Sequence, residues 1–176
     1  PGRGTLAPKA TLLKKTPGLF LDIGNDIAAD YPEIEYDDRI IDNLCMQLVT
    51  NPENYDCIVS TNLFGDILSD LTAGLVGGLG VTPGSNIGDD LAVFEAVHGR
   101  APDIAGQNVA NPTAMTRTAA MMLQHIGEDE AAAAIEQSLF AMYRDGDTLT
   151  QDVGGDASTS EFADALSDRV ASKVEA

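Results

Sequence analysis

Two carboxylates on one helical turn are the clearest chemical signal in the chain. The segment NLFGDILSD (residues 62–70) places Asp66 and Asp70 four residues apart, directly after Gly65. Like charges at this spacing repel by roughly 0.2–0.5 kcal/mol in an isolated helix, so either solvent screens them or a cation lies between them. In a generic acidic chain, solvent screening is the commoner arrangement. The spacing by itself leaves both arrangements open.

A second motif is a loop rich in turn residues. It reads FEAVHGRAPDIAGQNVANP (residues 94–112) and combines glycines and prolines with one histidine and one aspartate. Considered alone, His98 is more typical of a histidine bonded within its own turn than of a ligand contact. The glycine cluster at residues 77–80 follows a helical pattern instead of a strand, and no glycine occurs three residues after it. That cluster therefore does not predict a Rossmann dinucleotide loop.

Alternating hydrophobic patterns predict an α/β fold, because strand-like runs are followed by helical periodicity along most of the chain. Helices are expected at residues 18–30, 41–51, 64–76, 112–126 and 131–144, and after a capping box formed by Ser158 and Glu161. Strands are expected at residues 33–39, 57–60 and 92–97, the second being of the kind covered on both faces. In the helix at residues 112–126, the side chains expected to point inward are Met115, Ala119, Met122, Leu123 and Ile126. In the helix after the capping box they are Phe162, Ala165, Leu166 and Val170.

The chain is strongly acidic. Ten Lys and Arg against 28 Asp and Glu give a formal net charge of −18 over 176 residues. We expect no nucleic-acid partner, because phosphate binding needs a basic face. The charge is typical of adaptation to high salt, where screening reduces self-repulsion, and also of an ordinary acidic cytoplasmic protein. Both interpretations stay open.

The sequence predicts a soluble cytoplasmic protein with no membrane partner. Its N-terminus has no charged-then-apolar signal pattern, and no stretch approaches about eighteen uninterrupted apolar residues. Cys45 and Cys57 are the only cysteines, and neither has a second Cys or a His at metal-ligand spacing. We expect both to be buried packing thiols in a reducing compartment.

Taken together, several blocks resemble the isocitrate and isopropylmalate dehydrogenases, a family of metal-dependent decarboxylating dehydrogenases of 2-hydroxy acids. Besides the two motifs above, the blocks are PKATLLKKTPGLF (residues 8–20), IIDNLCMQLVTNP (40–52) and GGDASTSEFADAL (154–166), whereas the first seven residues do not match. The resemblance implies a three-layer α/β/α fold with a mixed sheet. Residues 1–78 would belong to the dimer-forming domain and residues 79–176 to the nucleotide-binding domain. Family members are much longer, so we expect the chain to be the C-terminal half of such an enzyme, with an incomplete fold.

The resemblance also implies a metal centre and a catalytic lysine. Asp42, Asp66 and Asp70 match the aspartates that bind Mg²⁺ or Mn²⁺, with Asp42 coming from one subunit of a dimer and the other two from its partner. Lys9 matches the lysine that handles the hydroxyl proton, and Asp42 shares the catalytic centre with it. Pro8, however, stands where the family commonly has His or Asp. Without the resemblance, Asp42 is a carboxylate favoured by a helix N-terminus and Lys9 a solvated loop lysine.

A nucleotide loop is implied by the same resemblance. The residues that match the loop around adenosine are His98, Gly99, Ala101, Pro102, Asp103, Ile104 and Asn111. Asp103 favours NAD, because a carboxylate accepts hydrogen bonds from ribose hydroxyls and repels a 2′-phosphate. Arg100 stands where the family usually has Ser or Thr, and its guanidinium could pair with a phosphate oxygen, including one on the 2′ position.

The implied reaction is the oxidative decarboxylation of a 2-hydroxy acid with NAD, most directly isocitrate to 2-oxoglutarate, in a homodimer or higher homo-oligomer. The blocks KATLLKKTPGLF, IIDNLCMQL and FEAVHG look more like the isocitrate branch of the family. 3-Isopropylmalate, homoisocitrate and tartrate remain open, since the residues that would touch the distal group of the substrate lie outside this chain. A non-catalytic regulatory subunit is disfavoured by the retention of Asp42, Asp66, Asp70 and Lys9. The fragment alone is expected to be inactive.

Overall fold

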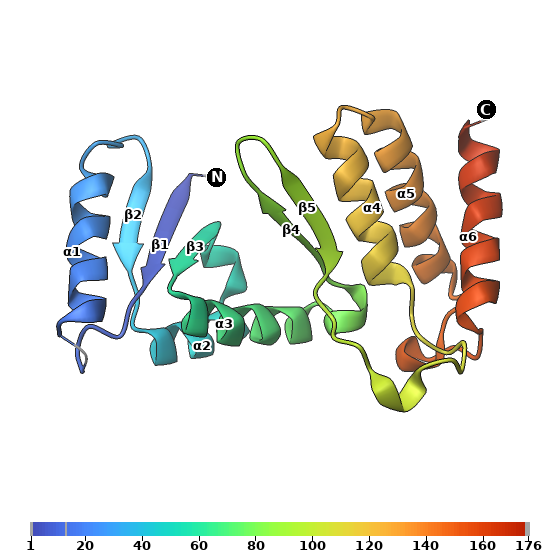
Figure 1. Cartoon of the computed structure of the whole chain (residues 1–176), viewed down its shortest axis with the longest axis horizontal. Coiled ribbons are helices and arrows are strands. Elements are labelled where there is room, and N and C mark those ends of the chain that lie inside the picture. The colour runs from blue at the N-terminus through green and yellow to red at the C-terminus, as the bar shows by residue number, and fades with distance from the viewer. Residues whose placement is uncertain (1, 13, 175–176) are drawn as a thin grey trace. The chain divides into compact units, whose positions relative to one another are not determined.

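The computed structural model describes residues 2–12 and 14–174, and the chain divides into two compact units, residues 1–75 and 76–176 (Figure 1). Pro1, Leu13, Glu175 and Ala176 lie outside the described residues, so the block PKATLLKKTPGLF is described only in part. Helices alternate with strands that are parallel in one sheet and antiparallel in the other, which confirms the predicted α/β class. The roles predicted for the two domains stay predictions.

The first unit contains a three-stranded parallel sheet in the order β2-β1-β3. The strands are β1 (Arg3–Ala7), β2 (Glu35–Asp38) and β3 (Cys57–Ser60), and the helices are α1 (Thr16–Ala28), α2 (Ile41–Thr50) and α3 (Asn62–Leu75), with the 3-10 turn η1 (Pro52–Asn54). The sequence patterns do not predict β1, yet it is the central strand and pairs with both neighbours. Thr5, Leu6 and Ala7 are buried as a result.

The core of this unit joins the sheet to α2 and α3. Its buried members are Ala7, Ile41, Leu44, Leu48 and Leu68. Its four helical members lie in α2 and α3, which therefore cover the sheet. Val49 and Ile67, on the same two helices, are exposed.

A charged network links the N-terminal half of β1 to β2. Asp37 lies 2.6 Å from Arg3 Nη2 and 2.8 Å from Arg39 Nη2, and Thr5 Oγ1 donates a hydrogen bond of 2.7 Å to it. Burial, the largest single influence, raises the pKa of Asp37, but the hydrogen bonds from Thr5 and Arg3 and the charge of Arg39 outweigh it. The pKa of Asp37 is therefore held below its ordinary value of 3.8, and the ionised carboxylate ties the two strands together.

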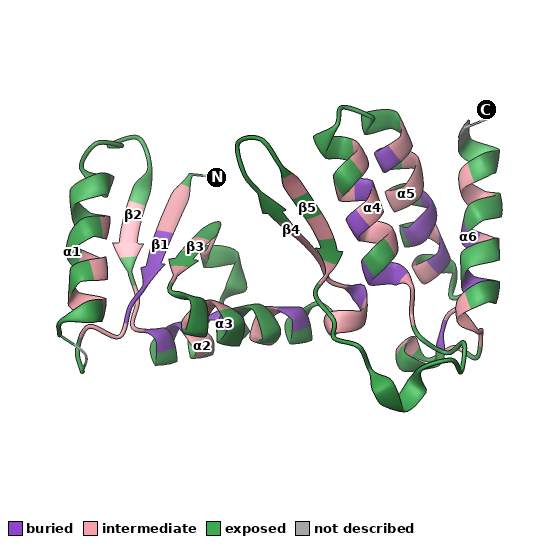
Figure 2. Ribbon diagram, in the orientation of Figure 1, coloured by how far each residue is buried: buried purple, intermediate pink, exposed green. Residues whose placement is uncertain are grey.

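Strand β3 is less covered than predicted. Cys57 and Val59 are exposed, while Ile58 and Ser60 are half-buried, so the expectation of a strand covered on both faces is wrong. The prediction that both cysteines are buried is also wrong, because Cys57 is exposed and Cys45 is only half-buried. The physical reason is that β3 is an edge strand, with a paired neighbour on one side, and Figure 2 shows it in the exposed and intermediate colours.

The second unit combines a β-hairpin with three helices. Its elements are η2 (Leu79–Val81), β4 (Pro83–Ile87), β5 (Ala92–Ala96), η3 (Pro102–Ile104), α4 (Thr113–His125), α5 (Asp129–Asp145), η4 (Gln151–Val153) and α6 (Thr159–Val174). Strands β4 and β5 pair antiparallel, and α4 packs against both of them. Helix α5 lies between α4 and α6 and packs against each (Figure 1).

The α5–α6 interface forms the core of the second unit. Its buried members are Leu139, Met142, Phe162 and Leu166, and Ala165 and Val170 pack against them. This confirms the inward face predicted for the last helix. The predicted capping box is also present, since Glu161 Oε2 accepts hydrogen bonds from the Ser158 amide (2.8 Å) and from Ser158 Oγ (2.7 Å).

The predicted inward face of α4 is wrong at its larger side chains. Met115, Met122 and Ile126 are exposed, and Ala119 and Leu123 are half-buried, while the buried residues of this helix are Thr113, Ala114, Thr118 and Ala120. Small side chains let α4 approach the hairpin closely, and Thr118 Oγ1 lies 3.1 Å from the Glu95 carbonyl oxygen of β5. Close packing of the small residues thus determines which face of α4 is buried, and the stripe of larger apolar side chains does not.

Across the part of the chain that the structure describes, every helix is too short or too polar to span a lipid bilayer.

Candidate active site

A cavity of about 610 Å³ lies within the second unit, in the loop between β5 and α4. Its lining residues are Leu79, Gly80, His98, Gly99, Arg100, Ala101, Ile104, Ala105, Gly106, Asn108, Val109, Ala110, Asn111, Asp152 and Thr159. The lining combines small and apolar side chains with a few polar groups. Both its size and its composition are typical of a site for an organic ligand, for which roughly 300–1,000 Å³ is usual.

The start of α6 holds the far end of this loop. The Thr159 amide donates to the Asn108 carbonyl oxygen (2.9 Å), and Thr159 Oγ1 donates to the Ala110 carbonyl oxygen (2.6 Å). The side chain of Asn108 donates to Ser160 Oγ at 2.7 Å and accepts from the Ser160 amide at 3.2 Å. Asn108 and Ser160 are 52 residues apart in the sequence. These bonds give the loop a defined shape although it has no regular secondary structure.

Asn111 is the polar centre of the cavity wall. Its Nδ2 donates to Asp152 Oδ2 (3.0 Å) and to the Tyr143 hydroxyl (3.1 Å), and its Oδ1 accepts from the Thr113 amide (3.0 Å). The last bond shows that Asn111 satisfies a free amide at the start of α4, although this helix begins one residue later than predicted. Asn111 therefore connects the loop, α4, α5 and η4.

Backbone strain is concentrated in the same loop. Ala101 has φ 42° and ψ 61°, a left-handed conformation that is unusual for a residue with a side chain and is further disfavoured before a proline. Asn108 is also left-handed, with φ 59°. Conformations of this kind persist only where the surroundings impose them, and they gather at binding sites.

Five of the residues predicted to bind the nucleotide line this cavity together: His98, Gly99, Ala101, Ile104 and Asn111. Pro102 and Asp103, also predicted, lie in η3 and are absent from the lining residues described here. His98 Nδ1 lies 3.1 Å from the Gly99 carbonyl oxygen, so its ring is in part engaged with its own turn.

Sequence reasoning missed several residues of the lining, above all Gly80 and Asp152. A Cβ added at Gly80 would stand 3.6 Å from Asp152 Oδ2 and 3.9 Å from Asn111 Cβ, so glycine keeps this side of the cavity open. The two glycines after Val153 signal a turn near Asp152, but Asp152 is 41 residues from Asn111 in the sequence. Nothing local in the sequence could have paired them.

The first unit carries the predicted metal ligands and lysine. Asp66 and Asp70 are exposed on α3, just after Gly65, where an added Cβ would stand only 3.2 Å from Ser60 Oγ. Carboxylate oxygens are the ligands that Mg²⁺ and Mn²⁺ prefer, but two of them do not complete a coordination shell. Within residues 2–12 and 14–174, no group of three or more His, Cys, Asp or Glu side chains comes close enough to hold a metal ion. The described chain thus presents a pair of ligands and leaves Asp42 apart from them.

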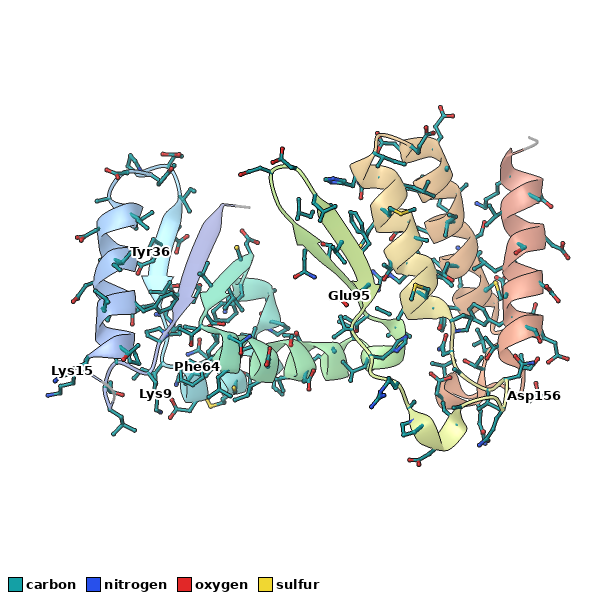
Figure 3. All side chains as sticks on the ribbon, viewed as in Figure 1. Lys9, Lys15, Tyr36, Phe64, Glu95 and Asp156 are labelled. Atoms are coloured by element: carbon teal, nitrogen blue, oxygen red, sulfur yellow. The ribbon has the colours of Figure 1, made fainter. Side chains whose placement is uncertain are left out.

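Asp42 is instead paired with Lys9. Lys9, labelled in Figure 3, follows β1, and its Nζ lies 2.7 Å from Asp42 Oδ1 in the first turn of α2. The hydrogen bond from Lys9 is the largest of the influences that lower the pKa of Asp42, and backbone amides at the helix start add to it. The structure therefore brings together the two residues predicted to be catalytic, with Asp42 held in its ionised form.

Comparison with known proteins identifies the family of the chain. A sequence model of the isocitrate/isopropylmalate dehydrogenase family matches residues 2–166. The isocitrate/homoisocitrate dehydrogenase of Thermus thermophilus is 55% identical over 161 residues, which cover 92% of this chain and 48% of that protein. The mitochondrial NAD isocitrate dehydrogenase catalytic subunit 5 of Arabidopsis thaliana is 50% identical over 163 residues, covering 92% of this chain and 44% of that protein.

The fold agrees as well. A crystal structure of isocitrate dehydrogenase from Methylococcus capsulatus superposes with a TM-score of 0.91 at 55% identity, covering 96% of this chain and 50% of that chain. The chain spans about half the length of the curated relatives it matches. The expectation that the first seven residues fall outside the family is wrong, because the match begins at residue 2 and includes β1. From residue 2 to residue 166, this chain belongs to the isocitrate/isopropylmalate dehydrogenase family.

Proposed function

We propose that the protein catalyses the oxidative decarboxylation of a 2-hydroxy acid with NAD and Mg²⁺ or Mn²⁺, and that isocitrate is the substrate. The observation that carries this proposal is the cavity around Asn111, in which five residues expected to wrap adenosine lie together. Two relatives that are 55% and 50% identical to this chain over the 161 and 163 residues aligned are named as isocitrate/homoisocitrate and NAD isocitrate dehydrogenases.

The second unit supplies the adenosine site of this proposal. Ile104, Ala101 and Val109 offer apolar contacts to a base, and Asp152 offers acceptor oxygens at its edge, since both amide hydrogens of Asn111 are donated to Asp152 and Tyr143. The nucleotide when bound would accept the hydride of the substrate alcohol. NAD is preferred over NADP because the pair Asp103–Ile104 provides no cation for a 2′-phosphate and because the Arabidopsis relative is named as an NAD enzyme.

The first unit supplies the acid groups. Asp66 and Asp70 provide two oxygen ligands from one turn of α3, and they fit a hard divalent cation in ligand type. Such a cation, when bound, polarises the hydroxyl and forming carbonyl oxygen of the substrate and offsets the negative charge that follows loss of carbon dioxide. The neutral amine form of Lys9 accepts the proton of the substrate hydroxyl and becomes an ammonium, which the Asp42 carboxylate, 2.7 Å away, holds in place.

The proposal requires a homodimer, because one chain presents only two of the three aspartates in one place. A second copy would bring its Asp42 to the Asp66–Asp70 pair. Helices α2 and α3 expose apolar side chains that such an interface would cover, namely Met46, Val49, Leu63, Ile67 and Leu75. Exposed apolar patches of this kind mark interaction surfaces.

The nucleotide site is tested by filling the cavity. Gly80→Gln places a long polar side chain in front of Asn111 and Asp152, where a Cβ is sterically allowed. We expect NAD affinity, measured by isothermal titration calorimetry on the 176-residue chain, to fall by about tenfold or more, which corresponds to about 1.4 kcal/mol. Gly74→Gln on the exposed surface of α3, where an added Cβ meets nothing within 4 Å, is the matched control. Equal affinities for both variants would refute the assignment of the cavity.

The substrate is tested by turnover at the native length of the protein. Isocitrate, homoisocitrate, 3-isopropylmalate and tartrate are compared with NAD and Mn²⁺, following NADH formation. We expect the highest kcat/KM for isocitrate and loss of turnover in Asp66→Asn and Asp70→Asn. Preferential turnover of 3-isopropylmalate would overturn the substrate, and unaffected turnover in the aspartate variants would overturn the metal-dependent mechanism.

A further inference from the structure

Arg100 is the one cation in the cavity wall that the structure leaves without a bonding partner. Within residues 2–12 and 14–174, the other arginines each bond to a carboxylate or a backbone oxygen, these being Arg3, Arg39, Arg117, Arg144 and Arg169. Arg100 makes no such bond in that described region, although the chain carries a net charge of −18. Its guanidinium is exposed and lines the cavity.

The backbone keeps Arg100 in this position. The next residue, Ala101, is held in a left-handed conformation, with φ 42°, ahead of Pro102. Because proline fixes its own φ and restricts the residue before it, the chain around Arg100 has few alternative conformations. The guanidinium is thus carried at the rim by a constrained turn, and only the side chain itself is free to adjust.

The acidic group of the same wall is already engaged. Asp152 accepts hydrogen bonds from Thr150 Oγ1 (2.6 Å) and Asn111 Nδ2 (3.0 Å), so its carboxylate has neutral donors and does not pair with Arg100. His98 is the remaining titratable side chain among the lining residues. An anionic ligand entering the cavity would therefore meet one free guanidinium, the side chain best suited to bind a phosphate group through two parallel N–H donors.

We infer that Arg100 binds a phosphate group of the adenosine nucleotide that occupies this cavity. The inference rests on the proposed function and adds a specificity-determining residue to it. It also changes the expected selectivity. Asp103, the carboxylate expected to repel a 2′-phosphate, is absent from the described lining, whereas Arg100 is part of it. The cavity would then tolerate a phosphate that Asp103 alone would reject.

The test measures binding of small probes, without any turnover. Adenosine, 5′-AMP and 2′-AMP are titrated into the 176-residue chain by isothermal titration calorimetry. We expect at least one phosphorylated probe to bind about tenfold more tightly than adenosine, as for one charge-assisted contact. The phosphate that carries the gain, 5′ or 2′, identifies which group Arg100 contacts.

Three variants isolate the guanidinium. Arg100→Ser should remove the gain and leave adenosine affinity unchanged, and Arg100→Lys should retain part of it. Arg144→Ser is the charge-matched control, since Arg144 lies on α5 with its side chain 79% exposed, outside the cavity lining. It should keep the full gain.

The outcomes separate the inference from the proposed function. If adenosine binds and Arg100→Ser keeps the phosphate gain, or if no phosphate gain exists, the role of Arg100 is refuted while the adenosine site stands. If none of the probes binds the unmodified chain, the adenosine site itself is refuted and the inference falls with it.

Discussion

Exchanging Asn111 for Asp tests whether the polar network of the cavity wall is as tightly coupled as its geometry indicates. The substitution preserves shape, and the new carboxylate still accepts from the Thr113 amide and can accept from the Tyr143 hydroxyl. It changes one contact decisively. The donor that lies 3.0 Å from Asp152 Oδ2 becomes an acceptor with a negative charge.

The magnitude follows from that distance. Two unit charges 3.0 Å apart repel by about 1.4 kcal/mol at the dielectric constant of water and by about 5.5 kcal/mol at an effective value near 20. Because Asp152 is exposed, the lower figure applies. Losing a hydrogen bond to a charged group adds about 1.5 kcal/mol, so Asn111→Asp should lower the free energy of unfolding by about 3 kcal/mol.

Urea denaturation followed by circular dichroism measures this loss, with Asn54→Asp as a control that adds the same charge at an exposed position in η1. Molar salt should shrink the repulsive part, because the screening length falls to roughly 3 Å. The double variant Asn111→Asp with Asp152→Asn restores one donor and one acceptor and should recover most of the lost stability. A loss no larger than that of Asn54→Asp, or a double variant no better than Asn111→Asp, would refute the coupling.

Three further predictions concern the acidic surface, the first sheet and the last helix. The thermal midpoint should rise between dilute buffer and molar salt, because screening relieves the self-repulsion of a chain with net charge −18; an unchanged or lower midpoint in a salt series by differential scanning calorimetry would contradict adaptation to high salt. Asp37→Asn should cost about 2 kcal/mol in urea denaturation, because the partly buried Arg3 loses its partner at 2.6 Å and keeps only the exposed Glu35 at 3.6 Å. Folding lowers the pKa of Asp37, so the ionised carboxylate stabilises the folded chain above its ordinary pKa of 3.8, and this stabilisation is lost as the pH falls through the lower pKa of the folded state. The free energy of unfolding of Asp37→Asn should therefore fall less on acidification than that of the unmodified chain. Ser158→Ala should destabilise α6 by about 1 kcal/mol through loss of its helix cap, measured in the same denaturation assay, and a change below about 0.3 kcal/mol would show that the capping box is not needed there.

Features that depend on neighbouring residues were predictable from the sequence. Strand β3 matches the predicted residues 57–60, the capping box of Ser158 and Glu161 is present, and the inward face of α6 is as expected. The one-turn spacing of Asp66 and Asp70 likewise follows from the geometry of a single helix. In each case the information lies within a few residues, where backbone geometry alone relates the side chains.

Features that depend on what packs against an element were decided by the tertiary structure. The sequence of β1 has little strand character, yet two parallel neighbours make it the centre of its sheet. Cys57 is exposed although it begins an apolar run, because its strand lies at an edge. Helix α4 buries its small residues, because only they permit its close approach to the hairpin.

The candidate site shows the same division between local and long-range information. The sequence by itself determined the family and singled out five residues that line the same cavity, because these are carried by contiguous motifs. Only the folded chain brought Asp152 to Asn111 across 41 residues, turned Arg100 into the cavity wall and left Asp103 out of it. Contacts of this kind arise from the packing of whole elements, for which no local spacing rule exists, because the free energy that selects them is summed over the surrounding core.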